Sequence, residues 1–91
     1  MNKAELVEAI TGLTNHKKSE TEKHLDAFIE VVTESLKKNE AVKLVGFGTF
    51  DVSDRKARVG RNPQTGEEIQ IPARRVPVFR PGKELKDTIA D

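Results

Sequence analysis

The segment from residue 54 to residue 75 most limits what this chain can fold into. It makes up more than a fifth of the 91 residues, yet its large apolar side chains are only Val59, Ile69 and Ile71. A segment this polar cannot be packed on both faces, so we expect it to protrude from the core that the rest of the chain builds. Segments that escape the demand for packing commonly carry function, and residues 54–75 are called the arm below.

Positive charge is concentrated in and beside the arm. Residues 55–83 contain eight basic and two acidic side chains, a formal charge of +6, and because the whole chain carries +1, the remainder carries −5. The basic residues are Arg55, Lys56, Arg58, Arg61, Arg74, Arg75, Arg80 and Lys83. An acidic body with one basic segment indicates a surface directed at a polyanion.

The rest of the chain offers little material for a core. Only 35% of the residues are apolar, and the chain has four Phe but no Trp, Tyr or Cys. A domain this short usually needs disulfides, a metal or a partner subunit, and without Cys we expect oligomerisation. No stretch has the roughly 18 consecutive apolar residues of a membrane helix, and the N-terminus does not resemble a signal peptide. The expected location is the cytoplasm, with no membrane partner.

Two amphipathic helices are predicted before residue 40. Asn2 and Glu5 have the spacing of a capping box, and apolar residues then recur at helical spacing over residues 3–13. Gly12 and the polar residues after it would end this helix, and Ser19 would cap the second one. The apolar stripe of the second helix comprises Leu25, Phe28, Ile29, Val32 and Leu36.

After residue 40 the apolar period changes to two, which predicts antiparallel strands and, at Arg61–Gly66, a turn within the arm. The expected fold class is α+β, with an N-terminal helical hairpin, a three-stranded antiparallel sheet with a long protruding β-ribbon, and a short C-terminal helix. The parts of this single domain are a helical dimerisation base (1–40), sheet strands (41–53 and 76–82), the arm (54–75) and a C-terminal helix (83–91).

An extended arm has suitable dimensions for following duplex DNA. From Arg55 to Pro63 it would span roughly 25–30 Å at about 3.3 Å per residue, close to one turn of B-DNA at about 34 Å. A two-stranded ribbon fits the major groove directly, whereas the minor groove would have to widen. The residues alone do not determine which of the two grooves the arm enters. Pro63 either wedges between base pairs or merely shapes the turn.

Four stretches of the chain carry a family resemblance. They are Gly46-Phe47-Gly48-Thr49-Phe50, the pair Arg55 and Arg58, Gly60-Arg61-Asn62-Pro63-Gln64-Thr65-Gly66, and Val76-Pro77-Val78-Phe79-Arg80-Pro81-Gly82-Lys83. Together they span much of the sequence and resemble the signature of the HU and integration host factor family of bacterial histone-like DNA-binding proteins, closest to HU. The pattern is long and its spacing is fixed, so it is far more specific than a short glycine motif.

The resemblance implies an intertwined homodimer, or a heterodimer with a paralogue, whose two arms embrace double-stranded DNA. HU-type proteins are themselves standard examples of minor-groove architectural proteins, so the groove and the intercalation of Pro63 are taken from the family. Together with the charge pattern, the resemblance predicts these DNA-binding residues: Lys3, Lys18, Arg55, Arg58, Arg61, Asn62, Pro63, Arg74, Arg75, Arg80 and Lys83. The expected dimer core contains Phe28, Leu36, Leu44, Phe47, Phe50 and Phe79.

The implied function is architectural: largely nonspecific binding, bending and compaction of duplex DNA in the bacterial nucleoid. The arm has few amide side chains, namely Asn62, Gln64 and Gln70, which favours weak sequence preference over a site-specific host factor. A different alternative is an RNA-binding or structural interaction module whose basic ribbon enters folded RNA or a partner.

Catalysis and metal binding are not predicted. The chain has no Cys nucleophile, no phosphate loop and no motif that places His near a Ser and Asp pair, so neither an enzyme nor a small-molecule substrate or cofactor is expected. His16, Glu20 and His24 are spaced like ligands on one helix face, but His16 is expected to lie outside the helix, and no metal site is predicted.

Overall fold

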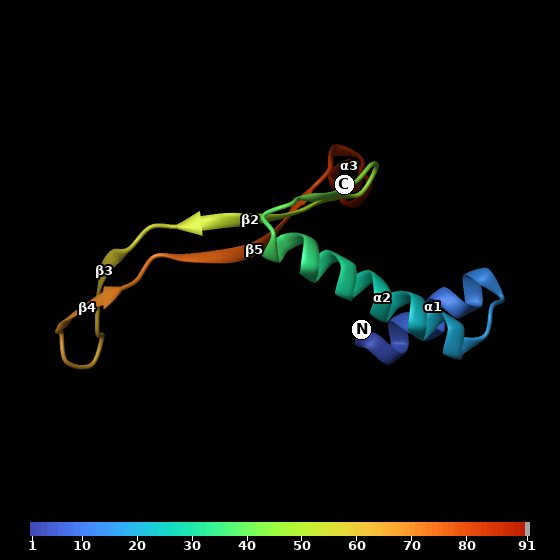
Figure 1. Cartoon of the computed structure of the whole chain (residues 1–91), viewed down its shortest axis with the longest axis horizontal. Helices are drawn as coiled ribbons and strands as arrows, with labels where there is room; N and C mark the ends of the chain where they lie inside the picture. The colour runs from blue at the N-terminus through green and yellow to red at the C-terminus, as the bar shows by residue number, and fades with distance from the viewer. Residues whose placement is uncertain (91) are drawn as a thin grey trace. The chain divides into compact units, whose positions relative to one another are not determined.

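The structure, a computed structural model, describes residues 1–90 and divides into two compact units, Met1–Glu34 and Ser35–Asp91 (Figure 1). The elements are, in order, α1 (Lys3–Thr14), α2 (Lys18–Lys37), β1 (Val42–Leu44), β2 (Gly48–Arg55), β3 (Arg58–Arg61), β4 (Glu68–Ile71), β5 (Arg74–Pro81) and α3 (Lys83–Ile89). This order confirms the α+β class. Asp91, the last residue of the predicted C-terminal helix, lies outside the described residues.

The N-terminal unit is a helical hairpin with the predicted capping box. The Asn2 side chain accepts a hydrogen bond from the Glu5 N–H at 2.9 Å, and the Glu5 carboxylate accepts one from the Asn2 N–H at 3.4 Å. Helix α1 ends where Asn15 adopts the left-handed conformation, with φ 60°. A hydrogen bond of 3.1 Å between the hydroxyls of Thr11 and the buried Thr21 links the two helices.

Two predicted details of this hairpin are wrong. Ser19 does not cap α2, because the helix already begins at Lys18 and the carbonyl of Lys17 accepts hydrogen bonds from the N–H groups of Glu20 and Thr21. Gly12 lies inside α1 and does not end it, since its cost of about 1 kcal/mol in a helix is too small to overcome the continuing hydrogen bonds.

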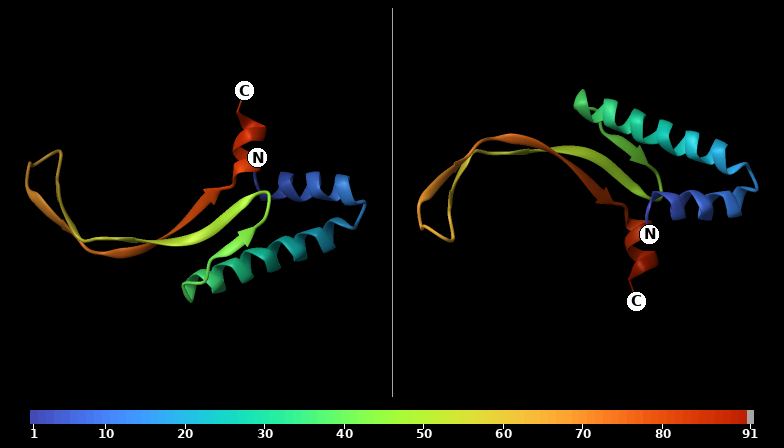
Figure 2. Two further views of the ribbon diagram at one scale, coloured as in Figure 1. Left: turned by 90° about the horizontal axis from the view of Figure 1, so that it is seen from above. Right: turned by 90° about the horizontal axis from the view of Figure 1, so that it is seen from below.

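The C-terminal unit is built on an antiparallel sheet with the strand order β1-β2-β5. The β2–β5 ladder runs from the Gly48–Pro81 pair to the Arg55–Arg74 pair, and β3 and β4 then form a separate two-stranded sheet. The predicted three-stranded sheet with a protruding ribbon is therefore confirmed. Figure 2 shows this ribbon bending along its length before it closes in a loop.

Three aromatic rings form the core of the C-terminal unit. The ring of Phe79 lies 5.2 Å from that of Phe47 and 5.1 Å from that of Phe50, and both contacts are tilted. Gly48 makes room for this cluster, because a Cβ atom at that position would lie 2.5 Å from the ring of Phe79. The glycine is therefore required for the ring to pack against the strand.

Little apolar surface is buried within one chain. Among residues 1–90 the buried apolar side chains are only Val7 and Val32. Phe28, Phe47 and Phe79 remain about two-fifths exposed, at 40%, 44% and 39%. The other predicted dimer-core residues, Leu36, Leu44 and Phe50, are half-buried. None of the helices in the described part of the chain has the length and apolar content needed to cross a membrane.

Candidate nucleic-acid interface

The distal part of the arm, residues 58–71, carries arginines on both of its faces. Side chains alternate between the faces of a strand, so Arg58 and Arg61 of β3 point to opposite sides. Arg58 shares its face with Ile71, and Arg61 shares the other with Glu68. Both arginines are exposed, and Val59 between them is 56% exposed, so this ribbon has no core of its own. It therefore offers a cation to each side of a groove.

The tip of the arm, residues 62–67, is closed by Asn62. Its N–H donates to the carbonyl of Glu67 at 2.9 Å, and its own carbonyl accepts from the N–H of Gly66 at 2.8 Å. Its side-chain oxygen accepts from the N–H of Gln64 at 2.9 Å, which forms an Asx turn around Pro63. Gly66 has φ 75°, a conformation that favours glycine. The sequence predicted Asn62 as a DNA contact, and the structure also gives it a role in shaping the tip.

Arg61 reinforces the same loop. Its Nη1 donates a hydrogen bond of 3.1 Å to the carbonyl of Gly66, which holds the guanidinium close to the tip. An arginine has five N–H donors, so most of them remain available to a ligand. The tip thus presents an exposed Pro63 beside a positioned cation.

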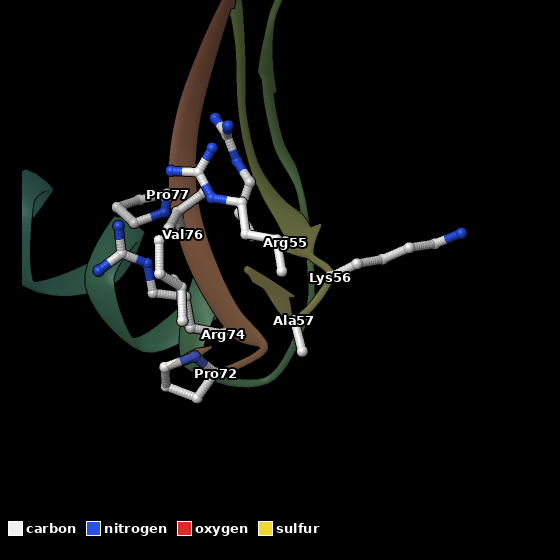
Figure 3. Close-up of a pocket in the computed structure, with 9 residues that line it drawn as sticks. Arg55, Lys56, Ala57, Pro72, Arg74, Val76 and Pro77 are labelled. Atoms are coloured by element: carbon white, nitrogen blue, oxygen red, sulfur yellow. The ribbon is translucent and has the colours of Figure 1, made fainter. Parts of the chain in front are cut away.

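The root of the arm, where the β2–β5 ladder ends, places Arg55 directly opposite Arg74. Both residues line a cavity of about 490 Å³, as does Arg58. Figure 3 shows the side chain of Lys56 extending away from Arg74 and from the other side chains of the cavity. Two strongly basic side chains are therefore held on one face of the sheet, at its last pair of residues.

Arg75 points to the other face and has a different partner. Its Nη2 donates hydrogen bonds to the carbonyls of Leu36 at 2.8 Å and Lys37 at 3.2 Å, at the C-terminal end of α2. Carbonyls at this end of a helix have no partner within the helix and carry partial negative charge, which a guanidinium neutralises. Arg75, a predicted DNA contact, therefore ties β5 to the end of α2.

The predicted DNA-binding lysines of the N-terminal unit are ion-paired. Lys3 Nζ lies 2.5 Å from a carboxylate oxygen of Asp26, and this hydrogen bond and the charge of Asp26 raise the pKa of Lys3. Lys18 Nζ lies 3.1 Å from the Glu8 carboxylate. All four side chains are more than half exposed, so a phosphate can reach both lysines, although it would have to compete with a carboxylate.

The two remaining predicted contacts lie near the sheet. Arg80 on β5 is 3.6 Å from the carboxylate of Asp51, and Lys83 is the exposed first residue of α3. The prediction did not include Lys56 among the site residues, although it lies in the arm and is exposed. Its place in the basic run Arg55-Lys56 was the available signal. No group of three His, Asp or Glu side chains suited to a metal occurs in residues 1–90.

Comparison with known proteins gives matches over nearly the full chain. Residues 1–90 match the family described as bacterial DNA-binding protein. The chain is 55% identical to DNA-binding protein HU-beta of Salmonella typhimurium and 51% identical to DNA-binding protein HU of Geobacillus stearothermophilus, each over 89 residues that cover 98% of this chain and 99% of the relative. It is also similar to the Anabaena HU–DNA cocrystal structure, with a TM-score of 0.92, 43% identity, and coverage of 99% of this chain and 98% of that one.

Proposed function

The chain belongs to the family of bacterial DNA-binding proteins, and we propose that it is an HU-type architectural protein that binds, bends and compacts double-stranded DNA with little sequence preference. Proteins of this family act by binding and not by catalysis, and the chain is not an enzyme. The proposed location is the bacterial nucleoid, within the cytoplasm.

The observation that carries this proposal is the arm. Its distal sheet has Arg58 and Arg61 on opposite faces, and both side chains are exposed and not packed in a core. Cations on both faces suit a ribbon that lies between two phosphate backbones, because each backbone then meets positive charge. Phosphate contacts of this kind carry no sequence information, which supports weak sequence preference.

We propose that the arm enters the minor groove and that Pro63 intercalates at a kink. Pro63 is apolar, exposed and held at the outermost turn by the hydrogen bonds of Asn62. Apolar wedges inserted between base steps partly unstack them and bend DNA toward the major groove, which exposes more of the duplex to the protein. The cost of bending is then offset by additional phosphate contacts.

A dimer is inferred from the aromatic side chains. Phe28, Phe47 and Phe79 are about two-fifths exposed, and a chain of this size with two buried apolar side chains in residues 1–90 has too small a core to be stable alone. We propose that a second copy, or a paralogue, covers Phe28, Leu36, Leu44, Phe47, Phe50 and Phe79. Two arms per dimer would give two kinks in one duplex.

Bending can be measured by fluorescence transfer between dyes at the two ends of a duplex of about 35 base pairs, a length that spans roughly three helical turns. Saturation with protein should shorten the distance between the ends. A structured RNA of equal charge, tested as a competitor at the same salt concentration, should displace the DNA poorly. Tight binding without shortening, or stronger binding to the RNA, would contradict the proposal.

A further inference from the structure

The last pair of the β2–β5 ladder brings two like charges together. Arg55 and Arg74 are directly opposite each other, so their side chains leave the sheet on the same face. Like charges in this position destabilise an antiparallel pair. The ladder stops at this pair: Lys56 and Ala57 on one strand, and Pro72 and Ala73 on the other, have no strand pairing before β3 and β4 begin.

No carboxylate neutralises this pair. Asp54 is next to Arg55 in sequence, but it lies opposite Arg75 and therefore on the other face. Asp51 is on the same face but is paired with Arg80. Within residues 1–90, neither Arg55 nor Arg74 has an ion pair or a side-chain hydrogen bond. They line two cavities: Asp54 lines one of them without pairing with either arginine, and the other, of about 490 Å³, has no acidic lining residue. An anion bound between Arg55 and Arg74 would therefore neutralise two charges that have no partner among the described residues.

The cavity beside the two arginines can hold such an anion. Its volume of about 490 Å³ is far larger than a phosphate group, and Arg58 from β3 also lines it. Arginine binds phosphate through two parallel N–H donors, so two guanidiniums can share the oxygens of one phosphate. Lys56 also lines the cavity, but its side chain extends away from the other lining side chains (Figure 3), so we assign the phosphate to the arginines.

We propose that Arg55 and Arg74 form a clamp for one backbone phosphate of the bound duplex, and that this phosphate tightens the root of the arm. The inference rests on the proposed DNA-binding function and adds a specific site to it. In the free protein, repulsion between the guanidiniums loosens the end of the ladder. In the complex, the phosphate lies between the two guanidiniums and attracts both of them. This attraction offsets their repulsion, so the arm is held more firmly against the sheet.

Binding of duplex DNA at several salt concentrations tests whether the two arginines share a phosphate. Each dimer has two arms, so with one shared phosphate per arm Arg55→Ala and Arg74→Ala should each change the slope of log K against log salt only slightly, while the double variant reduces its magnitude by about 1.8. Two independent phosphates per arm would reduce the magnitude by about 1.8 for each single variant and by about 3.6 for the double. Lys56→Ala is the control, and its effect should add to the others. Additive effects, or an unchanged slope in the double variant, would overturn the clamp.

Amide hydrogen exchange at residues 55–57 tests the tightening separately. Arg74→Glu replaces repulsion by an ion pair, so in the free protein these amides should exchange about two- to fivefold more slowly, although the variant binds DNA more weakly. Arg74→Gln should give an intermediate result. If Arg74 had a purely structural role, Arg74→Glu would not both slow amide exchange in the free protein and weaken DNA binding. Unchanged exchange in Arg74→Glu, or in the wild type after saturation with DNA, would overturn the proposal.

Inorganic phosphate at the same phosphate concentration distinguishes the source of the anion. It should slow exchange at residues 55–57 much less than the duplex, because only the duplex is held in place by the rest of the arm. Equal slowing by inorganic phosphate would overturn the assignment to the DNA backbone. Wild-type protein that fails to bind duplex DNA at any salt concentration would instead overturn the proposed function itself.

Discussion

The N-terminal helical unit and the arm use charge in opposite ways. In the helical unit, Lys3 and Lys18 are each paired with a carboxylate of the same unit. In the arm, Arg55, Arg58 and Arg74 have no carboxylate partner within residues 1–90. Unpaired cations held near one another cost free energy unless an anion joins them. The cations of the arm are therefore available to an anionic ligand, whereas Lys3 and Lys18 of the helical unit already have carboxylate partners.

The rest of the chain, called the body here, also differs from the arm in the interactions that hold it together. Outside the arm, α1 has a capping box and Phe79 packs against two other aromatic rings, whereas the arm keeps its shape through strand pairing and the hydrogen bonds of its tip. Stability and DNA binding should therefore respond to substitutions in different parts of the chain.

Phe79→Ala should have the largest effect on stability. The ring contacts Phe47 and Phe50, so its removal should lower the free energy of unfolding of the dimer by about 3 kcal/mol or more. Denaturant unfolding and sedimentation would measure the loss. Val59→Ala in the arm is the control and should change stability by less than about 0.5 kcal/mol. An equal loss in both variants would show that the arm is part of the core.

Removing both distal arginines should mainly affect binding. Arg58→Ala combined with Arg61→Ala should weaken binding to many duplex sequences by roughly tenfold to a hundredfold at about 0.1 M salt, with little change in unfolding. The control is Lys17→Ala combined with Lys23→Ala, which removes the same charge from the N-terminal unit. Equal weakening by the control would mean that affinity follows net charge and not the arm.

Pro63→Ala should reduce bending more than affinity. The phosphate contacts remain, but the wedge is lost, and each kink should decrease by about 20° or more. Fluorescence transfer across the duplex measures the bend, and the binding isotherm measures affinity in the same samples. Gln64→Ala, next to Pro63 in the tip, should leave the bend unchanged. An unchanged bend in Pro63→Ala would remove intercalation from the account.

Asn62→Ala should have the smallest effect, confined to the tip. It removes the acceptor for the Gln64 N–H, a hydrogen bond of about 1 kcal/mol, so the loop around Pro63 should become more mobile. Nuclear relaxation at the amides of Gln64 and Gly66 measures this motion on the picosecond to nanosecond timescale. Asn62→Asp keeps the acceptor and should restore order in the free protein. Unchanged relaxation in Asn62→Ala would show that the side chain does not shape the tip.

The sequence predicted the order of elements well because hydrophobic period and capping are local signals. It could not fix the register of the arm, since the predicted turn at Arg61–Gly66 lies one residue before the loop closed by Asn62 and Glu67. A shift of one residue at the turn changes the strand pairing by two, so Arg55 would face Pro72 and not Arg74. The charged pair at the root therefore became visible only in the structure.

The candidate site was predicted by residue type but not by partner. The family resemblance and the charge pattern gave Lys3 and Arg75 as DNA contacts, but not their bonds to Asp26 and to the carbonyls at the end of α2. Arg75 and Leu36 are 39 residues apart, and no local pattern reports a contact over that distance. The DNA-binding role of each named residue remains a prediction.

The claim that the arm binds DNA is tested most directly by a nuclear magnetic resonance spectrum of the isotope-labelled dimer saturated with duplex DNA. We expect contacts between residues 60–66 and protons of the minor groove, such as adenine H2 and the sugar H1′, while the amides of α1 near Val7 change little. If residues 60–66 show no contact with DNA and keep their free-state signals while the duplex is fully bound, the arm is not the element that grips DNA.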